Sequence, residues 1–430
     1  MGASGLQLLF LAFFGSGIAI EAALIALNRR EVLRHPELPP LFAAGGAAGA
    51  HFDAGAYASS RAYTLDRLSF DAFSLLYSAA ITLALLFSGI LPWADGWLAR
   101  AFGDGLHRGA LLLAGIVLIQ SLLAIPLSAY ATFRIEGRYG FNTMTWTLFR
   151  RDLIREFLVT AALGLPLLYA LLAMVRFLGG TWWVWAFGLL VAFQFGMMVL
   201  YPALIAPLFN RFRAMEEGES KRALMELADR LRFPAAGIQV MDGSRRSLHS
   251  NAYFTGFGSF RRIVIFDTLL RQLDLSELVG VLAHEIGHYK LGHILKMMVA
   301  RTVILGGALW LASLALRWPP LYQAFGFDAV PQPAGPFAGN PAAGLFLYLT
   351  VLSTLSVPLA PLQNLLSRRH EYQADAFAVQ ATGNTGAMAS ALAKLSRKNL
   401  SNLTPHPLYS AFHYSHPTLT ERIRALQATP

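Results

Sequence analysis

Apolar stretches separated by polar, arginine-bearing segments dominate the pattern along the chain. Seven of these stretches have roughly the 20-residue length that an α-helix needs to cross the hydrocarbon core of a bilayer. We predict membrane spans at Gly5–Leu27, Ala72–Leu91, Ala110–Tyr130, Phe157–Val175, Thr181–Tyr201, Thr302–Leu316 and Ala343–Leu362. The pattern therefore predicts a mainly α-helical, polytopic membrane protein with seven transmembrane helices.

The arginines around these spans predict an orientation. The first loop carries Arg29, Arg30, Arg34, Arg61 and Arg67, and the third carries Arg134, Arg138, Arg150, Arg151 and Arg155. The second loop has two arginines, and the fourth and sixth loops have neither Lys nor Arg. By the positive-inside rule, the first, third and fifth loops and the C-terminus are cytoplasmic, and the N-terminus lies outside.

Composition supports the membrane assignment and narrows the chemistry. The 430 residues are 55% hydrophobic and only 14% charged, which excludes an ordinary soluble protein. The net charge of +10 lies in the loops, so it reflects membrane topology and does not indicate nucleic-acid binding. Cysteine is absent, so any metal must be held by His and carboxylate side chains.

The fifth loop, residues 207–293, is the largest polar region. It begins with a predicted helix at Ser220–Arg232, and a short strand is predicted at Gly237–Met241. Two further strands, Asn251–Phe254 and Arg262–Phe266, are joined by the turn-rich residues 255–260 and predict a β-hairpin. We therefore expect a small sheet in a cytoplasmic, zincin-like domain.

A His-Glu-x-x-His motif ends this loop, with His284, Glu285 and His288. Residues four apart lie on one face of a helix, so both imidazoles can point at one ion, and Glu285 can reach a water on it. Asp274 and Glu277 predict a capping box at the start of this helix. We expect the helix to continue into the sixth span without a break.

A catalytic zinc site needs a third protein ligand. Glu371 and Asp375, four residues apart after the seventh span, could bind zinc and hydrogen-bond a ligand histidine, respectively. The alternative is a solvated helix in which Arg368 or Arg369 pairs with Glu371, and both interpretations remain open at this point. His370 is a rival ligand, and we expect His293 to be a polar residue near the membrane surface.

Several further motifs occur along the chain in a fixed order. They are Tyr-Gly-Phe-Asn (139–142), Ala-Pro-Leu-Phe-Asn (206–210), His-Ser-Asn-Ala-Tyr-Phe-Thr-Gly (249–256), Arg-Ile-Val-Ile-Phe-Asp-Thr-Leu-Leu (262–270), the His-Glu-Ile-Gly-His block, Arg-Arg-His-Glu-Tyr-Gln-Ala-Asp-Ala (368–376), and Tyr-Ser-His-Pro (414–417) with Glu421-Arg422. In these motifs the chain resembles the type I CAAX prenyl endopeptidases, seven-helix integral-membrane zinc proteases.

The resemblance implies a complete site. Glu371 would be the third ligand of one Zn²⁺ per chain, and seven helices would enclose a chamber with the site at its cytoplasmic end. Substrate backbone would lie along the edge formed by Asn251, Ala252, Tyr253 and Phe254. Asn251 and His416 would contact the scissile region. Taken alone, Asn251 could equally hydrogen-bond its own backbone, and His416 could simply precede a helix.

The resemblance also gives a domain division and a reaction. Residues 1–206 would hold five spans, 207–293 the edge strand and His-Glu-x-x-His helix, 294–364 two spans, and 365–430 the remaining catalytic residues. Zinc would activate water for peptide hydrolysis with Glu285 as general base and His416 as a second oxyanion donor. The substrate would be a peptide or protein, prenylated at a CAAX C-terminus.

Two alternatives to CAAX processing stay open. One is a zinc protease for quality control of membrane proteins, and the other is a transporter with a structural metal site. Intramembrane Glu21, Lys296 and Arg301 could favour the transporter, but no pair of broken helices indicates inverted repeats. We expect a monomer in the bilayer, and the Ala, Leu and Gly bias suits a bacterial inner-membrane protein.

Overall fold

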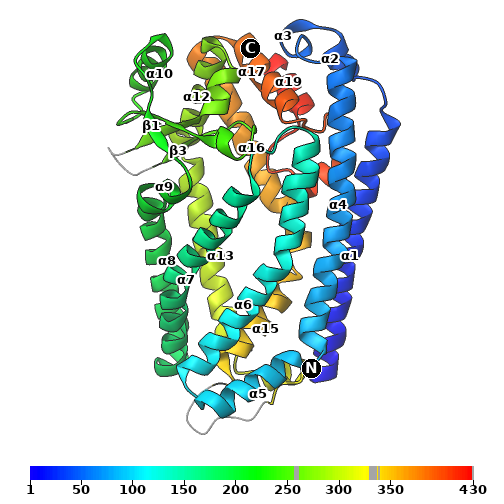
Figure 1. Cartoon of the computed structure of the whole chain (residues 1–430), viewed down its shortest axis with the longest axis vertical. Coiled ribbons are helices and arrows are strands. Elements are labelled where there is room, and N and C mark those ends of the chain that lie inside the picture. The colour runs from blue at the N-terminus through cyan, green and yellow to red at the C-terminus, as the bar shows by residue number, and fades with distance from the viewer. Residues whose placement is uncertain (256–260, 329–336, 338, 429–430) are drawn as a thin grey trace.

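The computed structural model describes residues 1–255, 261–328, 337 and 339–428. Long helices run side by side along the longest axis, and most of the short elements gather at the end that holds the C-terminus (Figure 1). The N-terminus lies at the opposite end, where α5 (Ile90–Phe102) runs across the bundle. We call these the polar end and the N-terminal end.

Six described helical segments are long and apolar enough to cross a membrane. They are α1 (Ala3–Arg34), α4 (Ala54–Phe87), α6 with its π-helical end (Leu106–Glu136), α7 (Trp146–Phe177), α8 with its flanking turns and α9 (Gly179–Phe209), and α13 (His293–Ala315). They confirm the first six predicted spans, although most are longer than expected from hydropathy.

A bent pair of helices, α15 (Pro341–Ser353) and α16 (Ser356–Thr382), lies where the seventh span was predicted, and the two helices meet at 63°. The bend lies at residues 354–355, before the two prolines expected to disturb the span. Pro358 is thereby in the first turn of α16, where its missing N–H removes no helical hydrogen bond. The expected boundary at residues 364–365 falls inside α16, so one helix carries membrane and catalytic residues.

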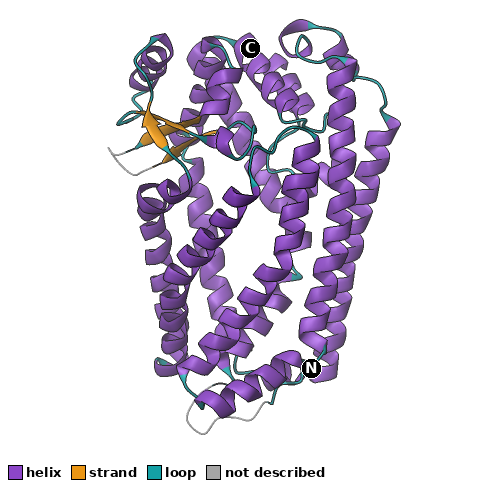
Figure 2. Cartoon of the chain, in the orientation of Figure 1, coloured by secondary structure: helices purple, strands orange, loops and turns teal. Residues whose placement is uncertain are grey.

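A four-stranded sheet lies at the polar end, on one side of the helices (Figure 2). Its order is β1 (Phe212–Ala214), β2 (Ile238–Met241), β4 (Arg262–Phe266) and β3 (Ala252–Thr255). The predicted hairpin is present as an antiparallel β3–β4 pair with Tyr253 opposite Val264. The predicted connection at 256–260 lies outside the described residues. Strand β1 and the parallel β2–β4 pairing were not predicted.

The remaining α-helices lie outside the predicted spans. They are α2 (Pro40–Ala43), α3 (Gly46–Gly49), α10 (Glu219–Arg230), α11 (Asp267–Gln272), α12 (Leu275–Lys290), α14 (Pro319–Gln323), α17 (Thr385–Lys398), α18 (Pro407–His413) and α19 (Leu419–Ala428). We had expected α12 to continue into α13 without a break, and this prediction is wrong. Gly292 adopts a left-handed conformation with φ +68° and separates the two helices.

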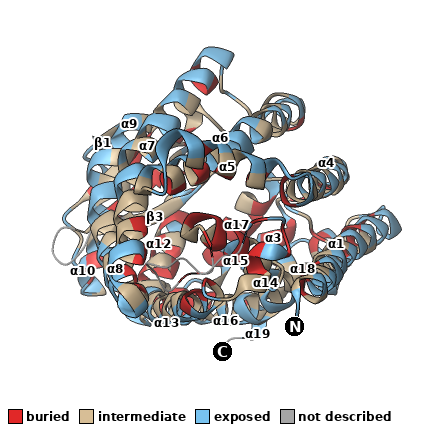
Figure 3. Cartoon of the chain, turned by 90° about the horizontal axis from the view of Figure 1, so that it is seen from below, coloured by how far each residue is buried: buried red, intermediate tan, exposed pale blue. Residues whose placement is uncertain are grey.

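Apolar cores occupy the two ends of the molecule. At the polar end, β4 residues Ile263 and Ile265 pack with Leu282 and Ile286 of α12. At the N-terminal end, α1, α5, α8 and α14 share a second core. Seen from below, the outward faces of α1 and α4 are mostly exposed (Figure 3). This exposure is what lipid-facing helices require.

The middle of the bundle is different from its ends. Helix α7 has no buried residue between Phe149 and Leu172, and α13 has none between Ala312 and His293. Helix α8 has none after Ala186. The central turns of these described helices are therefore not packed into a dense bundle.

Candidate active site

Helix α12 presents both histidines of the His-Glu-x-x-His motif on one face. Asp274 starts the helix with the predicted capping box, in which its side chain accepts from the Glu277 N–H and the Glu277 side chain accepts from the Asp274 N–H. Further along, His284 and His288 turn their Nε2 atoms toward each other at 3.2 Å. The two rings converge on one point, as four-residue spacing requires.

Glu371 on α16 completes this group. Its Oε1 is 3.2 Å from His288 Nε2, and its Oε2 is 3.5 Å from His284 Nε2. Glu371 is only 4% exposed, and Arg368 pairs with Glu421 instead, so the solvated-helix alternative is wrong. Among the described residues, only these three form a metal-type cluster, and His370 is not part of it.

Gly287, between the two histidines, lets α16 approach α12 closely. A Cβ at this position would lie 3.3 Å from Ala374 Cα and 3.1 Å from a ring carbon of Phe377. Only glycine avoids this crowding without a shift of α16. The same motif therefore supplies two ligands and the close approach that brings in the third.

The ligand atoms suit a divalent cation. Glu371 Oε2 is buried without an aligned hydrogen-bond donor, although His416 Nδ1 lies 2.8 Å away. Burial alone would lower the pKa of His284, but hydrogen bonds with Asp375 and Glu371 raise this pKa to about 9. The carboxylates thus stabilise positive charge here, and two imidazoles with one carboxylate match the ligand set of catalytic zinc sites.

Asp375 and Arg422 support His284 on the side away from the ligand cluster. Asp375 Oδ1 is 2.8 Å from His284 Nδ1, the arrangement expected for Asp375. Arg422 donates to both carboxylate oxygens of Asp375, at 2.8 and 2.5 Å. Sequence reasoning assigned no role to Arg422. Charge balance could have pointed to Arg422, because a buried aspartate needs a cation beside it.

Glu285 lies where α12 meets strand β3. It lines a narrow, mostly apolar recess together with Ala252, Tyr253 and Phe254. Burial raises the pKa of Glu285 above its ordinary value. Strand β3 is the last strand of the described sheet on this side, so its outer edge is available to an extended peptide.

The structure distinguishes the two remaining predicted contact residues. His416 is at the site, with a 65% exposed side chain and its Nδ1 on Glu371. Asn251 stands at the entrance to β3, where its Oδ1 accepts the backbone N–H of Ala252 at 2.8 Å. This contact is the local one that we considered as the alternative to substrate binding.

Two family models match adjoining parts of the chain. Residues 29–211 match the CAAX prenyl protease N-terminal region, described as five membrane helices. Residues 214–430 match peptidase family M48. Together they cover both the spans and the metal cluster.

Individual proteins match over most of their length. CAAX prenyl protease 1 homologs from Arabidopsis thaliana and Homo sapiens are 38% and 32% identical, over 86% and 88% of this chain and 87% of each relative. The crystal structure of S. mikatae Ste24p superimposes with a TM-score of 0.90 at 32% identity, covering 98% of both chains. These relatives are eukaryotic and do not support the expected bacterial origin.

Proposed function

This chain belongs to peptidase family M48 as a homologue of CAAX prenyl protease 1, and from that premise we propose that His284, His288 and Glu371 hold its one zinc ion. The observation that carries the proposal is the convergence of these three side chains beside Glu285 and the open edge of β3. A transporter with a structural metal site is not supported by this arrangement or by the family.

When bound, zinc supplies a Lewis acid and lowers the pKa of its water to about 7. The chain's own residues transfer the proton and stabilise the oxyanion. Glu285, whose pKa is raised by burial, takes a proton from the attacking water and returns it to the leaving amine. His416 donates to the oxyanion from the exposed side of the site.

Strand β3 binds the substrate backbone. An extended peptide that adds to β3 would have its main-chain groups hydrogen-bonded to residues 252–255 and its scissile bond near Glu285. This mode of binding depends little on side chains, so it also suits fragments of membrane proteins. The quality-control alternative therefore shares the same site.

The unpacked middle of the bundle supports an enclosed chamber between the two cores. No more than 17% of the residues in the most apolar window of any of the six spans are buried. Such helices would meet lipid on one side and a cavity on the other. A prenyl chain on the substrate could enter this space while the peptide lies along β3. We therefore propose prenylated CAAX proteins as the substrate class, cut on the cytoplasmic side.

Cleavage of a farnesylated CAAX peptide and its unprenylated twin tests the proposal. Purified wild-type protein should release the C-terminal tripeptide, whereas Glu285→Gln should retain zinc and lose at least a factor of about 10² in rate. A preference for the farnesylated peptide supports a role for the lipid. Normal cleavage by Glu285→Gln would contradict the base assignment, and equal cleavage of both peptides would contradict the lipid requirement.

A further inference from the structure

The second ligand, His288, has a hydrogen-bond partner that the family motif does not assign. His288 Nδ1 lies 3.0 Å from Nδ1 of His293, which is only 2% exposed. His293 is therefore not the surface residue that the sequence suggested. It stands to His288 as Asp375 stands to His284, on the ring nitrogen that faces away from the metal cluster.

The break between α12 and α13 makes this contact possible. Residues five apart on a continuous helix are about 140° apart around its axis, so their side chains diverge. The left-handed Gly292 ends α12 and redirects the chain, and His293 then begins α13. The break thus returns a histidine to the site immediately after the motif ends.

Gln373 on α16 binds the other nitrogen of His293. Its Oε1 is 3.0 Å from His293 Nε2. An amide oxygen can only accept a hydrogen bond, so His293 carries its proton on Nε2 and presents a lone pair at Nδ1. His288 must then donate from its Nδ1, which leaves its Nε2 lone pair facing Glu371 and the ligand cluster.

We propose that His293 and Gln373 are positioning residues that fix the metal-binding tautomer and ring orientation of His288. The proposal rests on the metal site proposed above and names the support for its second histidine. His284 would be held by the carboxylate of Asp375, and His288 by the uncharged pair of His293 and Gln373. The surroundings of the ion then carry less negative charge than they would with two aspartates.

The neighbouring ring provides a matched control. His370 stacks on His293 with ring centroids 4.1 Å apart and planes at 10°, but its buried Nδ1 has no hydrogen-bond partner. His293→Phe and His370→Phe each replace one ring of the same stacked pair. Only the first removes the acceptor for His288.

Zinc affinity measured by competition with a chelator tests the proposal without any substrate. Loss of such a supporting partner typically weakens metal binding about 10–100-fold. We expect that loss for His293→Phe in detergent-solubilised full-length protein, and less than about a threefold change for His370→Phe. Thermal unfolding of the metal-free variants checks that both fold.

Gln373 gives a second test at an exposed position, where folding is not at risk. Gln373→Glu keeps an acceptor for His293 and should retain or tighten zinc binding, whereas Gln373→Leu removes it and should weaken binding. Wild-type affinity in His293→Phe, equal losses in the two His→Phe variants, or identical Glu and Leu variants would overturn the proposal. Failure of wild-type protein to bind zinc would instead overturn the metal site itself.

Discussion

Asp375 has two partners whose loss has separable effects. It accepts a hydrogen bond from His284 and balances the charge of Arg422 in a largely buried setting. Asp375→Asn keeps an oxygen for His284 but leaves Arg422 without its closest charge. Breaking a buried ion pair costs about 3–5 kcal/mol, so we expect the unfolding midpoint to fall more clearly than zinc affinity does.

Denaturant unfolding and chelator competition on the same protein measure both effects of Asp375→Asn. Asp229→Asn, on the exposed face of α10, serves as the control and should change neither quantity. An unchanged unfolding free energy in Asp375→Asn would mean that Arg422 finds another partner.

At the scale of residues, the sequence alone predicted His284, Glu285 and His288 because their spacing lies within one helix. It left Glu371 undecided, because only its burial and its distance to two histidines separate a ligand from a solvated acid. It misjudged His293, because the redirection of the chain at Gly292 has no hydropathy signal.

The turn between α12 and α13 allows a prediction about one element boundary. No atom lies within 4 Å of a Cβ built on Gly292, so Gly292→Ala is opposed only by the left-handed backbone, at about 1–2 kcal/mol. Any relaxation of that backbone would move His293 away from His288. We expect a modest stability loss together with weaker zinc binding.

Gly383 offers the matched control for Gly292→Ala. It ends α16 with φ +66° and also has open space around it, but it lies outside the site. Gly383→Ala should lower stability by a similar amount, measured by thermal unfolding, with zinc affinity unchanged. Equal zinc affinities in the two variants would show that the turn tolerates alanine without moving His293.

A second element boundary depends on pH. His249 precedes β3 and contacts Glu136, at the end of α6, and Asn399, after α17, at 3.1 and 3.0 Å. The Glu136 contact raises the pKa of His249 above its ordinary value of 6.5, while burial and, to a smaller extent, Arg67 oppose this rise. A raised pKa means that the interaction stabilises fully below about pH 6.5 and is lost as pH rises through the folded-state pKa.

Thermal unfolding of wild type and Glu136→Gln across pH 6–9 tests this dependence. The difference in unfolding midpoint should be largest at pH 6 and should narrow as pH rises. A constant or widening difference would show that His249 is neutral in the folded protein.

At the scale of elements, hydropathy predicted seven spans, of which six are single helical segments in the described structure and the seventh falls on a bent pair of helices. Periodicity predicted three of the four described strands. The three-residue β1 was too short to give a pattern. The bend between α15 and α16 was expected at the prolines but lies just before them. Pro358 is tolerated in the first turn of α16, whereas Pro361 lies inside the helix. Local sequence therefore predicted the elements better than it predicted where they turn.

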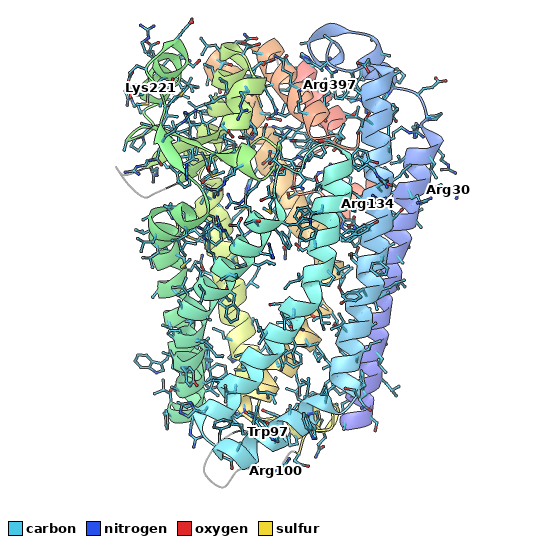
Figure 4. The ribbon with its side chains drawn as sticks, viewed as in Figure 1. Arg30, Trp97, Arg100, Arg134, Lys221 and Arg397 are labelled. Carbon is cyan, nitrogen blue, oxygen red and sulfur yellow. The ribbon has the colours of Figure 1, made fainter. Side chains whose placement is uncertain are left out.

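The orientation of the whole molecule can be tested directly because the chain contains no cysteine. Arg30 and Arg397 lie toward the polar end and Arg100 at the N-terminal end (Figure 4). In sealed membrane vesicles whose cytoplasmic face points outward, a membrane-impermeant maleimide should label Arg30→Cys and Arg397→Cys and should reach Arg100→Cys only after detergent opens the vesicles. The reverse pattern would place the site outside, against the positive-inside rule.

At the scale of the molecule, local sequence patterns could not predict which distant segments contact each other. Helices α12 and α16 meet although α13, α14 and α15 lie between them in sequence. The resemblance to a known family supplied this pairing, and the geometry explains it through Gly287. The low burial in the middle of α7, α8 and α13 has no local signature, because lipid-facing and cavity-facing positions can both be apolar.

The distance in sequence between α12 and α16 also determines when a newly made molecule becomes active. A ribosome makes His284 and His288 before the sixth and seventh predicted spans, and it adds Glu371 and then Arg422 only after them. Until then, the half-built site has two ligands and no third carboxylate. The protease therefore becomes active only after its spans have been inserted into the membrane. A polypeptide terminated before residue 371 cannot cut neighbouring nascent chains.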